Sequence, residues 1–392
     1  MRDPLSERVK EIKPSGIRKF FDIVSEMPDA ISLGVGEPDF ETPWHIREEG
    51  IYSLEKARTH YTSNAGLKEL KQEVAAYLHR RFYLNYHAQK EVLVTVGGSE
   101  AIDIAMRAML NPGDEVLIPQ PSYVAYLPCT TLTGGVPVPI ELQEKNQFKL
   151  TAEELLAAIT PKTKVLILPF PNNPTGSIMD REDLEKIAKV IIDHDLWVVS
   201  DEIYSELTYS GNHVSIAAIP GMAERTLVIN GFSKSYAMTG WRLGYVAGPE
   251  RVISHMTKIH QYCIMCAPTT SQYAAVEALR NGDEDVAHMK EVYNQRRRYL
   301  MHAMREIGLE CFEPFGAFYI FPNISRFGMT SDEFANLLLQ KEQVAVVPGT
   351  AFGDCGEGFV RISYAYSLDT LKRAMERIGR FVKWLDAGRP EE

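Results

Sequence analysis

The chain has 392 residues, of which 45% are hydrophobic and 24% charged, a composition typical of soluble globular proteins. Its formal net charge of −10 argues against nucleic-acid binding through a broad basic surface. The first ten residues lack the apolar core of a secretory signal, and no apolar run is long enough to span a membrane. We therefore expect a cytoplasmic protein.

The cysteines give no sign of a disulfide framework or a metal site. They form an odd set in a long chain: Cys129, Cys263, Cys266, Cys311 and Cys355. Cys263 and Cys266 form a CxxC pair, but no second pair or histidine cluster completes a zinc site. We interpret them as buried packing residues and predict no metal.

Short apolar runs alternate with helical patterns through most of the chain. The first expected element is a helix at Ile17–Ser25, with Ser15 as its candidate cap. The later elements are a strand at Val92–Val96, a turn at Gly97–Ser99, a helix at Glu100–Leu110, strands at Glu115–Ile118 and Lys164–Phe170, a helix that Asp180 caps, and strands at Trp197–Val199 and Leu227–Ile229.

Such apolar strands, separated by amphipathic helices, predict an α/β fold with a mainly parallel sheet covered by helices on both faces. In these sheets, ligands bind beyond the carboxyl ends of the strands. Ser99, Asn173, Asp201 and Lys234 each come just after a strand. We therefore expect these four side chains to converge on one crevice.

The last hundred residues predict a smaller α+β domain. Its expected strands are Phe318–Phe321, Val344–Val347 and Phe359–Ser363, with helices near 331–342 and 368–385. We expect the N-terminal segment to join this domain, which gives the boundaries 1–45, 46–285 (the large domain) and 286–392. The tail Gly388–Glu392 reads as disordered.

Lys234 stands at the end of the apolar run Thr226–Phe232 and is followed by hydroxyl side chains and Arg242. A lysine amine condenses with a carbonyl to form a Schiff base. Hydroxyl donors and a guanidinium are suited to a phosphate. Together they indicate a lysine that holds pyridoxal phosphate, and hence amino-acid chemistry.

Asp201 lies at the end of a strand, where its carboxylate could keep the pyridine nitrogen of this cofactor protonated. Taken alone, a helix cap or a surface aspartate explains it better. Tyr204 and Asn173 can reach the phenolic oxygen of the cofactor, although an asparagine in such a loop is ordinarily turn chemistry.

Gly98, Ser99 and Glu100 open a helix directly after a strand, where exposed amides suit an anion. Ser233 and Arg242 would complete this phosphate site. Tyr123 could stack on the ring of the cofactor, and a core aromatic is an equally good reading.

Arg361 lies within the strand pattern Val360–Tyr364, where burying a charge is costly. A bidentate contact with the α-carboxylate of a substrate would account for it, and an arginine on a surface strand is the alternative. Gly36 lacks the context of a dinucleotide-binding turn and more simply permits close approach of the backbone to a ligand.

The assembled motifs resemble the class I/II aminotransferases of pyridoxal phosphate fold type I, in the branch with aspartate, aromatic and N-acetyl-diaminopimelate aminotransferases. The motifs follow the order of the family over about residues 15 to 385. They are SLGVGEPDF, HYTSNAG, VTVGGSEA, PNNPTG, SDEIY, SKSYAMTGWRLGY and FVRISYA.

The resemblance implies a role for each matching residue. Lys234, Asp201 and Tyr204 would be catalytic, with Lys234 carrying the cofactor and moving the α-proton. Arg361, Gly36 and Asn173 would hold the substrate carboxylate. Tyr61 would reach the phosphate of the neighbouring subunit, which implies a homodimer with a shared active site.

The resemblance further implies a ping-pong transfer of an amino group from an L-amino acid to a 2-oxo acid, with 2-oxoglutarate as the expected acceptor. Phe20, Tyr123, Tyr126, Tyr262 and Phe352 favour an aromatic donor, although core packing explains them equally well. Aspartate and N-acetyl-diaminopimelate remain open as donors. A C–S β-lyase with the same cofactor is the alternative activity.

Overall fold

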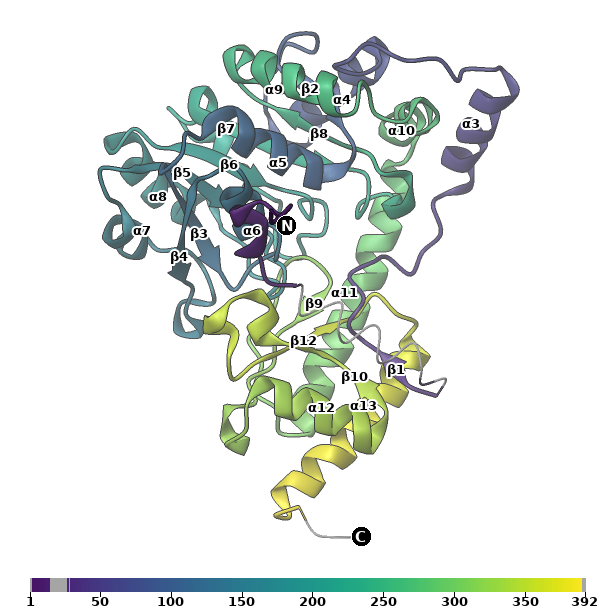
Figure 1. Cartoon of the computed structure of the whole chain (residues 1–392). Coiled ribbons are helices and arrows are strands. Elements are labelled where there is room, and N and C mark those ends of the chain that lie inside the picture. Colours follow the sequence, from purple (N-terminus) through teal and green to yellow (C-terminus); the bar gives the residue numbers. More distant parts are fainter. Residues whose placement is uncertain (1, 15–26, 28, 390–392) are drawn as a thin grey trace.

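A seven-stranded sheet with the order β2-β8-β7-β6-β5-β3-β4 forms the centre of the protein (Figure 1). The computed structural model describes residues 2–14, 27 and 29–389. All strands of this sheet share one direction except β8, which is antiparallel to both β2 and β7. The strands are β2 Val92–Thr95, β3 Glu115–Gln120, β4 Val136–Glu141, β5 Thr163–Leu168, β6 Trp197–Asp201, β7 Thr226–Gly231 and β8 Gly244–Ala247.

The apolar runs form strands because both faces of the sheet are buried. Side chains alternate between the faces along a strand. In β3, Val116 and Ile118 pack into the core on one side, whereas Leu117 packs into the core on the other. A continuous apolar run is therefore needed, and the predicted mainly parallel, doubly covered sheet is confirmed.

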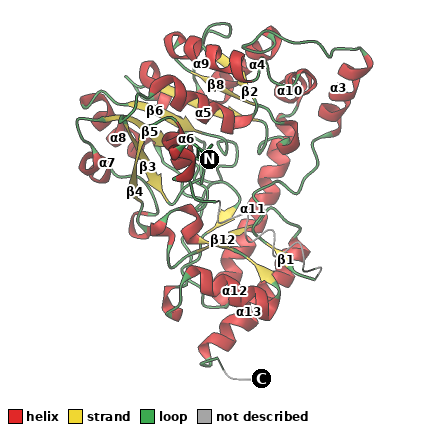
Figure 2. Ribbon diagram, in the orientation of Figure 1, coloured by secondary structure: helices red, strands yellow, loops and turns green. Residues whose placement is uncertain are grey.

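Helices cover each face of the sheet (Figure 2). One face packs against α5 and α9, and the opposite face packs against α4, α8 and α10. The helices of this part are α3 Trp44–Glu55, α4 Lys68–Phe82, α5 Gly97–Met109, α6 Tyr126–Leu132, α7 Ala152–Ala158, α8 Arg181–Asp193, α9 Glu250–Cys263 and α10 Thr269–Asn281.

A second, smaller group of strands and helices has its own apolar core. A three-stranded antiparallel sheet runs β11-β12-β9, and β1 pairs with β10 in parallel. The elements are β1 Ile31–Ser32, β9 Tyr319–Ile320, β10 Val344–Ala345, β11 Val347–Pro348, β12 Val360–Ser363, α11 Asp283–Glu306, α12 Ser331–Glu342 and α13 Leu368–Asp386. Residues far apart in the sequence thus lie side by side.

The expected single strand at Val344–Val347 is wrong. The chain forms two short strands there, because β10 pairs with β1 whereas β11 pairs with β12. Val346 lies between the two pairings and is buried. An unbroken apolar run carries no sign of such a change of partner.

Helix boundaries largely follow the local signals. Asp180 caps α8 as predicted, and its side chain accepts a hydrogen bond from the amide of Asp183 at 3.0 Å. Helix α5 begins at Gly97, earlier than the predicted start at Glu100. The predicted helix at Ile17–Ser25 and its cap Ser15 lie outside the described residues, as does the end of the tail, residues 390–392.

Short elements complete the described chain. Helix α1 spans Glu7–Lys10, and 3-10 turns lie at Glu144–Asn146, Ile216–Ala218, Ala223–Arg225, Thr239–Trp241, Ser325–Phe327, Gly349–Phe352 and Asp354–Gly356. The predicted domain boundary at 285/286 falls in the first turn of α11, and the three domain ranges stay a prediction. Over the residues described, the search for a helix with the length and apolar character of a membrane span finds none.

Candidate active site

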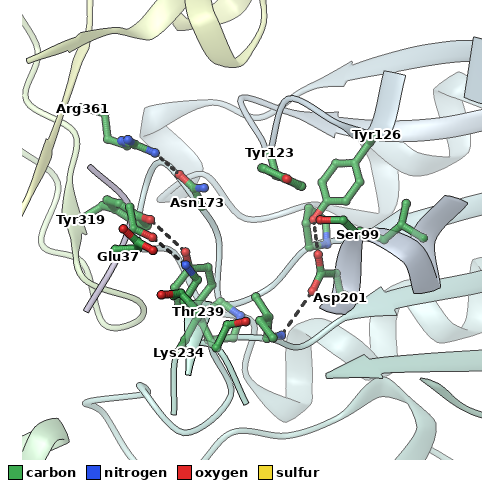
Figure 3. Close-up of a pocket in the computed structure, with 18 of the residues that line it drawn as sticks. Glu37, Ser99, Tyr123, Tyr126, Asn173, Asp201, Lys234, Thr239, Tyr319 and Arg361 are labelled. Carbon is green, nitrogen blue, oxygen red and sulfur yellow. Dashed lines mark hydrogen bonds between the residues drawn. The ribbon is translucent and has the colours of Figure 1, made fainter. Parts of the chain in front are cut away.

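A cavity of about 510 Å³ opens at the edge of the large sheet where the parallel strands end (Figure 3). The loops that follow β2, β3, β5, β6 and β7 bring side chains to the cavity. The predicted residues that line it are Gly36, Gly98, Ser99, Tyr123, Asn173, Asp201, Tyr204, Ser233, Lys234, Arg242 and Arg361. The expected convergence of Ser99, Asn173, Asp201 and Lys234 is therefore observed.

The reversed direction of β8 explains how Arg242 reaches the same edge. Arg242 lies two residues before the start of β8, and the first residue of β8, Gly244, pairs with Gly231 at the end of β7. An antiparallel strand starts where its parallel neighbours end. Arg242 therefore stands among the loops that follow β2 and β7.

The opposite wall of the cavity comes from the small sheet and from the segment after β1. Tyr319 lies in β9 and Arg361 in β12, and both are buried. Gly36 and Glu37 follow β1 and also line the cavity. The site is therefore assembled between the two groups of strands.

Lys234 points into the cavity, and its Nζ donates a hydrogen bond to the carbonyl oxygen of Gly36 at 2.6 Å (Figure 3). Burial lowers the pKa of Lys234 to about 8. The Glu37 carboxylate opposes this shift, whereas Arg361 and Arg242 add to it. A much larger share of Lys234 is then neutral near pH 7 than for an ordinary lysine, as nucleophilic attack on a carbonyl requires.

Asp201 ends β6 and is nearly inaccessible to solvent. Burial raises the pKa of Asp201, and two donors oppose this shift. The Tyr126 hydroxyl donates to Oδ2 at 2.7 Å, and the amide of Ile203 donates to Oδ1 at 3.3 Å. The carboxylate is therefore held in one orientation with two of its lone pairs used (Figure 3).

Tyr204 and Tyr319 join the two walls. Their hydroxyl oxygens lie 2.9 Å apart, and both side chains are buried. Burial raises the pKa of Tyr204 well above its ordinary value. Both phenols therefore remain protonated near neutral pH, and one hydroxyl proton is free to be donated into the cavity.

Arg361 is 2% exposed and lies between the rings of Tyr319 and Phe352, with its guanidinium carbon 4.4 and 4.7 Å from their centroids. It donates one hydrogen bond to Oδ1 of Asn173 at 2.9 Å and another to the carbonyl oxygen of Gly34. Its Nε has no partner in the described structure. A buried guanidinium with neutral partners and an unpaired N–H is suited to bind an anion.

The turn between β2 and α5 is a close-packed backbone cradle. Gly97 has a φ of +75°, and a Cβ there would lie 2.8 Å from the guanidinium of Arg242. Gly244 faces the turn from β8, where a Cβ would lie 2.7 Å from the backbone of Gly97. Only glycine permits this approach, which leaves the amides at the start of α5 facing the cavity beside Arg242.

Two predicted site residues do not line the cavity. The carboxylate of Glu100 turns back to the amide of Val96 and to His260, so its predicted part in the phosphate site, through the amides at the helix start, stays a prediction. Tyr61 is 82% exposed on the outer surface. Its predicted contact with a neighbouring subunit stays a prediction.

Several lining residues were not singled out from the sequence as site residues. Tyr126 is predicted only as a nearby aromatic, and Glu37, Thr239 and Tyr319 are not among the predicted site residues. Glu37 adjoins Gly36 within a recognised motif, so proximity could have indicated it. Tyr319 lies in an apolar strand and gives no such signal.

The other aromatic and cysteine predictions have mixed outcomes. Phe352 is buried against Arg361, whereas Tyr262 is 88% exposed and Phe20 lies outside the described residues. The interpretation of Cys263 as a buried packing residue is wrong, because its side chain is exposed and Cys266 is half-buried. The described part of the chain brings no three potential metal-binding side chains together.

Known proteins share this fold and sequence over nearly the whole chain. The family described as aminotransferase class I and II matches residues 28–378. The aspartate aminotransferase of Pyrococcus abyssi is 46% identical over 97% of this chain and 98% of its own. The aromatic-amino-acid aminotransferase 2 of Thermococcus litoralis is 44% identical over the same shares. The crystal structure of an aromatic aminotransferase from Pyrococcus horikoshii has a TM-score of 0.89 at 44% identity, covering 93% of this chain and 98% of that one.

The chain belongs to the class I and II aminotransferase family, with the fold of pyridoxal phosphate fold type I. It is a transaminase and uses pyridoxal phosphate. The cavity fits this cofactor, because it combines a lysine of lowered pKa with a buried carboxylate and a glycine cradle beside an arginine. These are the groups that an aldehyde, a pyridine nitrogen and a phosphate require.

Proposed function

We propose that this transaminase takes the amino group of an aromatic L-amino acid and passes it to a 2-oxo acid, with 2-oxoglutarate as acceptor, in a ping-pong reaction. The observation that carries the donor preference is the composition of the cavity wall. Four tyrosines line it, and its basic side chains, over the described residues, are Lys234, Arg242 and Arg361. These three have proposed tasks below, so the described part of the chain leaves no basic side chain for the second carboxylate of a dicarboxylic donor.

Lys234 is the proposed attachment point and proton carrier. When bound, pyridoxal phosphate supplies an aldehyde carbon that bonds to amines and a ring that accepts an electron pair from the substrate α-carbon. With a pKa of about 8, the amine of Lys234 can take a proton at Nζ and release it again near neutral pH. Its hydrogen bond to Gly36 keeps Nζ inside the cavity.

Asp201 is the proposed partner of the pyridine nitrogen. Tyr126 and the amide of Ile203 stabilise its ionised form against burial. An ionised carboxylate would keep that nitrogen protonated, which strengthens the electron-accepting character of the ring. Tyr123 would lie against the ring face, and Tyr204 and Asn173 would donate to the phenolic oxygen.

Two groups of hydrogen-bond donors would bind the phosphate of the cofactor and the α-carboxylate of the substrate. Ser99, Ser233, Arg242 and the amides of Gly98 and its neighbours would bind the phosphate, where the start of α5 favours negative charge. Arg361 would bind the substrate α-carboxylate through its unpartnered Nε edge, with Asn173 and Gly36 beside it.

A homodimer with a shared site is also proposed, in the cytoplasm. Tyr61, Tyr262, Ile264 and Met265 are between 43% and 88% exposed, and the Asn64 side chain donates to the carbonyl oxygen of Met265 at 2.8 Å. Exposed apolar side chains on two segments joined by a hydrogen bond are typical of an interface surface. Tyr61 would extend from there to the phosphate of the partner.

The donor preference is tested with the complete enzyme and a panel of amino acids. Each of phenylalanine, tyrosine, aspartate and glutamate is mixed with the loaded enzyme, and the rate of cofactor conversion is followed by absorbance. We expect kcat/KM for phenylalanine and tyrosine to exceed that for aspartate by about tenfold or more. Faster conversion by aspartate would instead establish a dicarboxylate donor. Parallel double-reciprocal plots with 2-oxoglutarate test the ping-pong order.

The C–S β-lyase activity is not favoured, because the similar proteins are aminotransferases. Cystathionine provides a direct check in the same experiment. Release of pyruvate at a rate comparable to amino transfer would overturn this preference.

A further inference from the structure

Glu100 and His260 form a buried pair directly behind the turn that carries Gly98 and Ser99. Glu100 lies in the first turn of α5, and His260 lies near the end of α9, which packs alongside α5. Nδ1 of His260 lies 2.6 Å from Oε1 of Glu100. The side chain of His260 is 0% exposed and that of Glu100 is 11% exposed, so the pair is largely shielded from solvent.

The second oxygen of Glu100 is also engaged. Oε2 accepts a hydrogen bond from the amide of Val96, the residue that precedes α5. The carboxylate is thus held on the side of the helix away from the cavity, and Glu100 is not among the lining residues. A carboxylate in the first turn can also reach the other free amides at the helix start, and the contact with His260 directs Oε1 elsewhere.

The free amides at the start of α5 are the ones proposed above to bind the phosphate. A carboxylate in the first turn that was free to rotate would compete for these amides and would repel a dianion. The pairing with His260 removes this competition by holding one carboxylate oxygen in place. Glu100 then contributes its backbone to the turn without bringing its charge into the cavity.

The direction of the hydrogen bond between His260 and Glu100 follows from the chemistry of the two groups. Its Nε2 is buried and has no partner in the described structure. A carboxylate oxygen accepts hydrogen bonds, so the close contact with Oε1 of Glu100 places a proton on Nδ1. Nδ1–H then donates to Glu100, and His260 acts as a fixed donor.

We propose that His260 is a positioning residue for the phosphate end of the site: by holding the Glu100 carboxylate away from the start of α5, it keeps those amides available to the phosphate of the cofactor. The inference rests on the proposed phosphate position at Gly98 and Ser99. His260 itself does not line the cavity and acts only through Glu100.

The test measures ligand binding to the full-length protein freed of cofactor. Dissociation constants for pyridoxal phosphate and for pyridoxal, which lacks the phosphate, are obtained from quenching of protein fluorescence. His260→Leu removes the donor, and we expect about tenfold weaker binding of pyridoxal phosphate with unchanged binding of pyridoxal. His260→Asn retains an amide donor near the Nδ1 position and should bind as the unaltered protein does.

The decisive variant is His260→Leu combined with Glu100→Gln. If the freed negative charge causes the loss, removing that charge restores phosphate-dependent binding to the level of Glu100→Gln alone. A double variant as weak as His260→Leu would show a packing defect and overturn the proposal. An equal loss for pyridoxal, or no loss in His260→Leu, would also overturn it.

Two further variants keep the outcomes distinguishable. His260→Phe retains a flat ring without the donor and replaces His260→Leu should the latter fail to fold, as judged by circular dichroism. Ser99→Ala tests the phosphate position itself. If Ser99→Ala leaves the affinity for pyridoxal phosphate unchanged, the proposed phosphate position fails, and with it this role of His260. If only Ser99→Ala weakens binding, the phosphate position stands and the role of His260 is refuted.

Discussion

The rate at which the cofactor-free protein captures pyridoxal phosphate should follow the pKa of Lys234. Burial lowers this pKa from 10.5 to about 8, although Glu37 opposes the shift. At pH 7, about one Lys234 side chain in ten is then neutral, against roughly one in 3,000 at the ordinary pKa. Because only the neutral amine attacks a carbonyl, burial should accelerate capture about 300-fold at this pH.

Stopped-flow absorbance between pH 7 and pH 10 measures this rate. The amine loses its proton as the pH rises, so capture should accelerate about tenfold above its pH 7 value and then level off beyond pH 8 to 9. Glu37→Gln removes a negative charge that favours the protonated amine, so its profile should shift to lower pH. Glu182→Gln, on the exposed side of α8, is the matched control and should leave the profile unchanged.

Three results would refute this reasoning. A rate that continues to rise past pH 10 would show that Lys234 has the pKa of an ordinary lysine. A shift of the Glu37→Gln profile to higher pH would contradict the sign of the electrostatic effect. Capture that persists in Lys234→Ala would show that another amine reacts.

Two substitutions in the cavity test separate contacts. Arg361→Lys loses the planar donor edge, so KM for the amino donor should rise about 10- to 100-fold in steady-state assays, with pyridoxal phosphate binding unchanged. A fall in cofactor affinity instead would contradict the proposed contact of Arg361 with the substrate α-carboxylate. Tyr126→Phe removes a donor that lowers the pKa of Asp201, so the acid limb of the kcat–pH profile should move to higher pH. Tyr86→Phe, whose buried hydroxyl has no partner in the described structure, is its control, and equal profiles for both would refute the prediction.

Much of the site could be predicted because a parallel sheet gathers its functional residues in a regular way. Asn173, Asp201 and Lys234 each follow an apolar strand, and the strands end at a common edge. This geometry depends only on strand order and direction, both of which leave traces in the sequence. Arg361 could also be identified, since a buried charge in a strand needs a partner.

Contacts between distant segments could not be predicted in the same way. Tyr126 and Asp201 are hydrogen-bonded across 75 positions, and Tyr204 meets Tyr319 across 115. An isolated tyrosine in an apolar helix or strand has the same local pattern whether it packs in the core or donates to a catalytic group. The side-chain direction of Glu100 leaves no local signal for a similar reason, because its partner His260 lies on another helix.

Burial alone does not explain the chemistry of the cavity. It raises the pKa of Asp201 and lowers that of Lys234, so it drives both groups toward their neutral forms. A neutral Lys234 suits attack on a carbonyl, whereas a neutral Asp201 would lose its proposed partner. Hydrogen bonds distinguish the two groups. Asp201 accepts from Tyr126 and Ile203, which favour its charge, whereas Nζ of Lys234 donates to the uncharged carbonyl of Gly36. The donors around Asp201 therefore favour its charge in the same cavity in which burial gives Lys234 a larger neutral share.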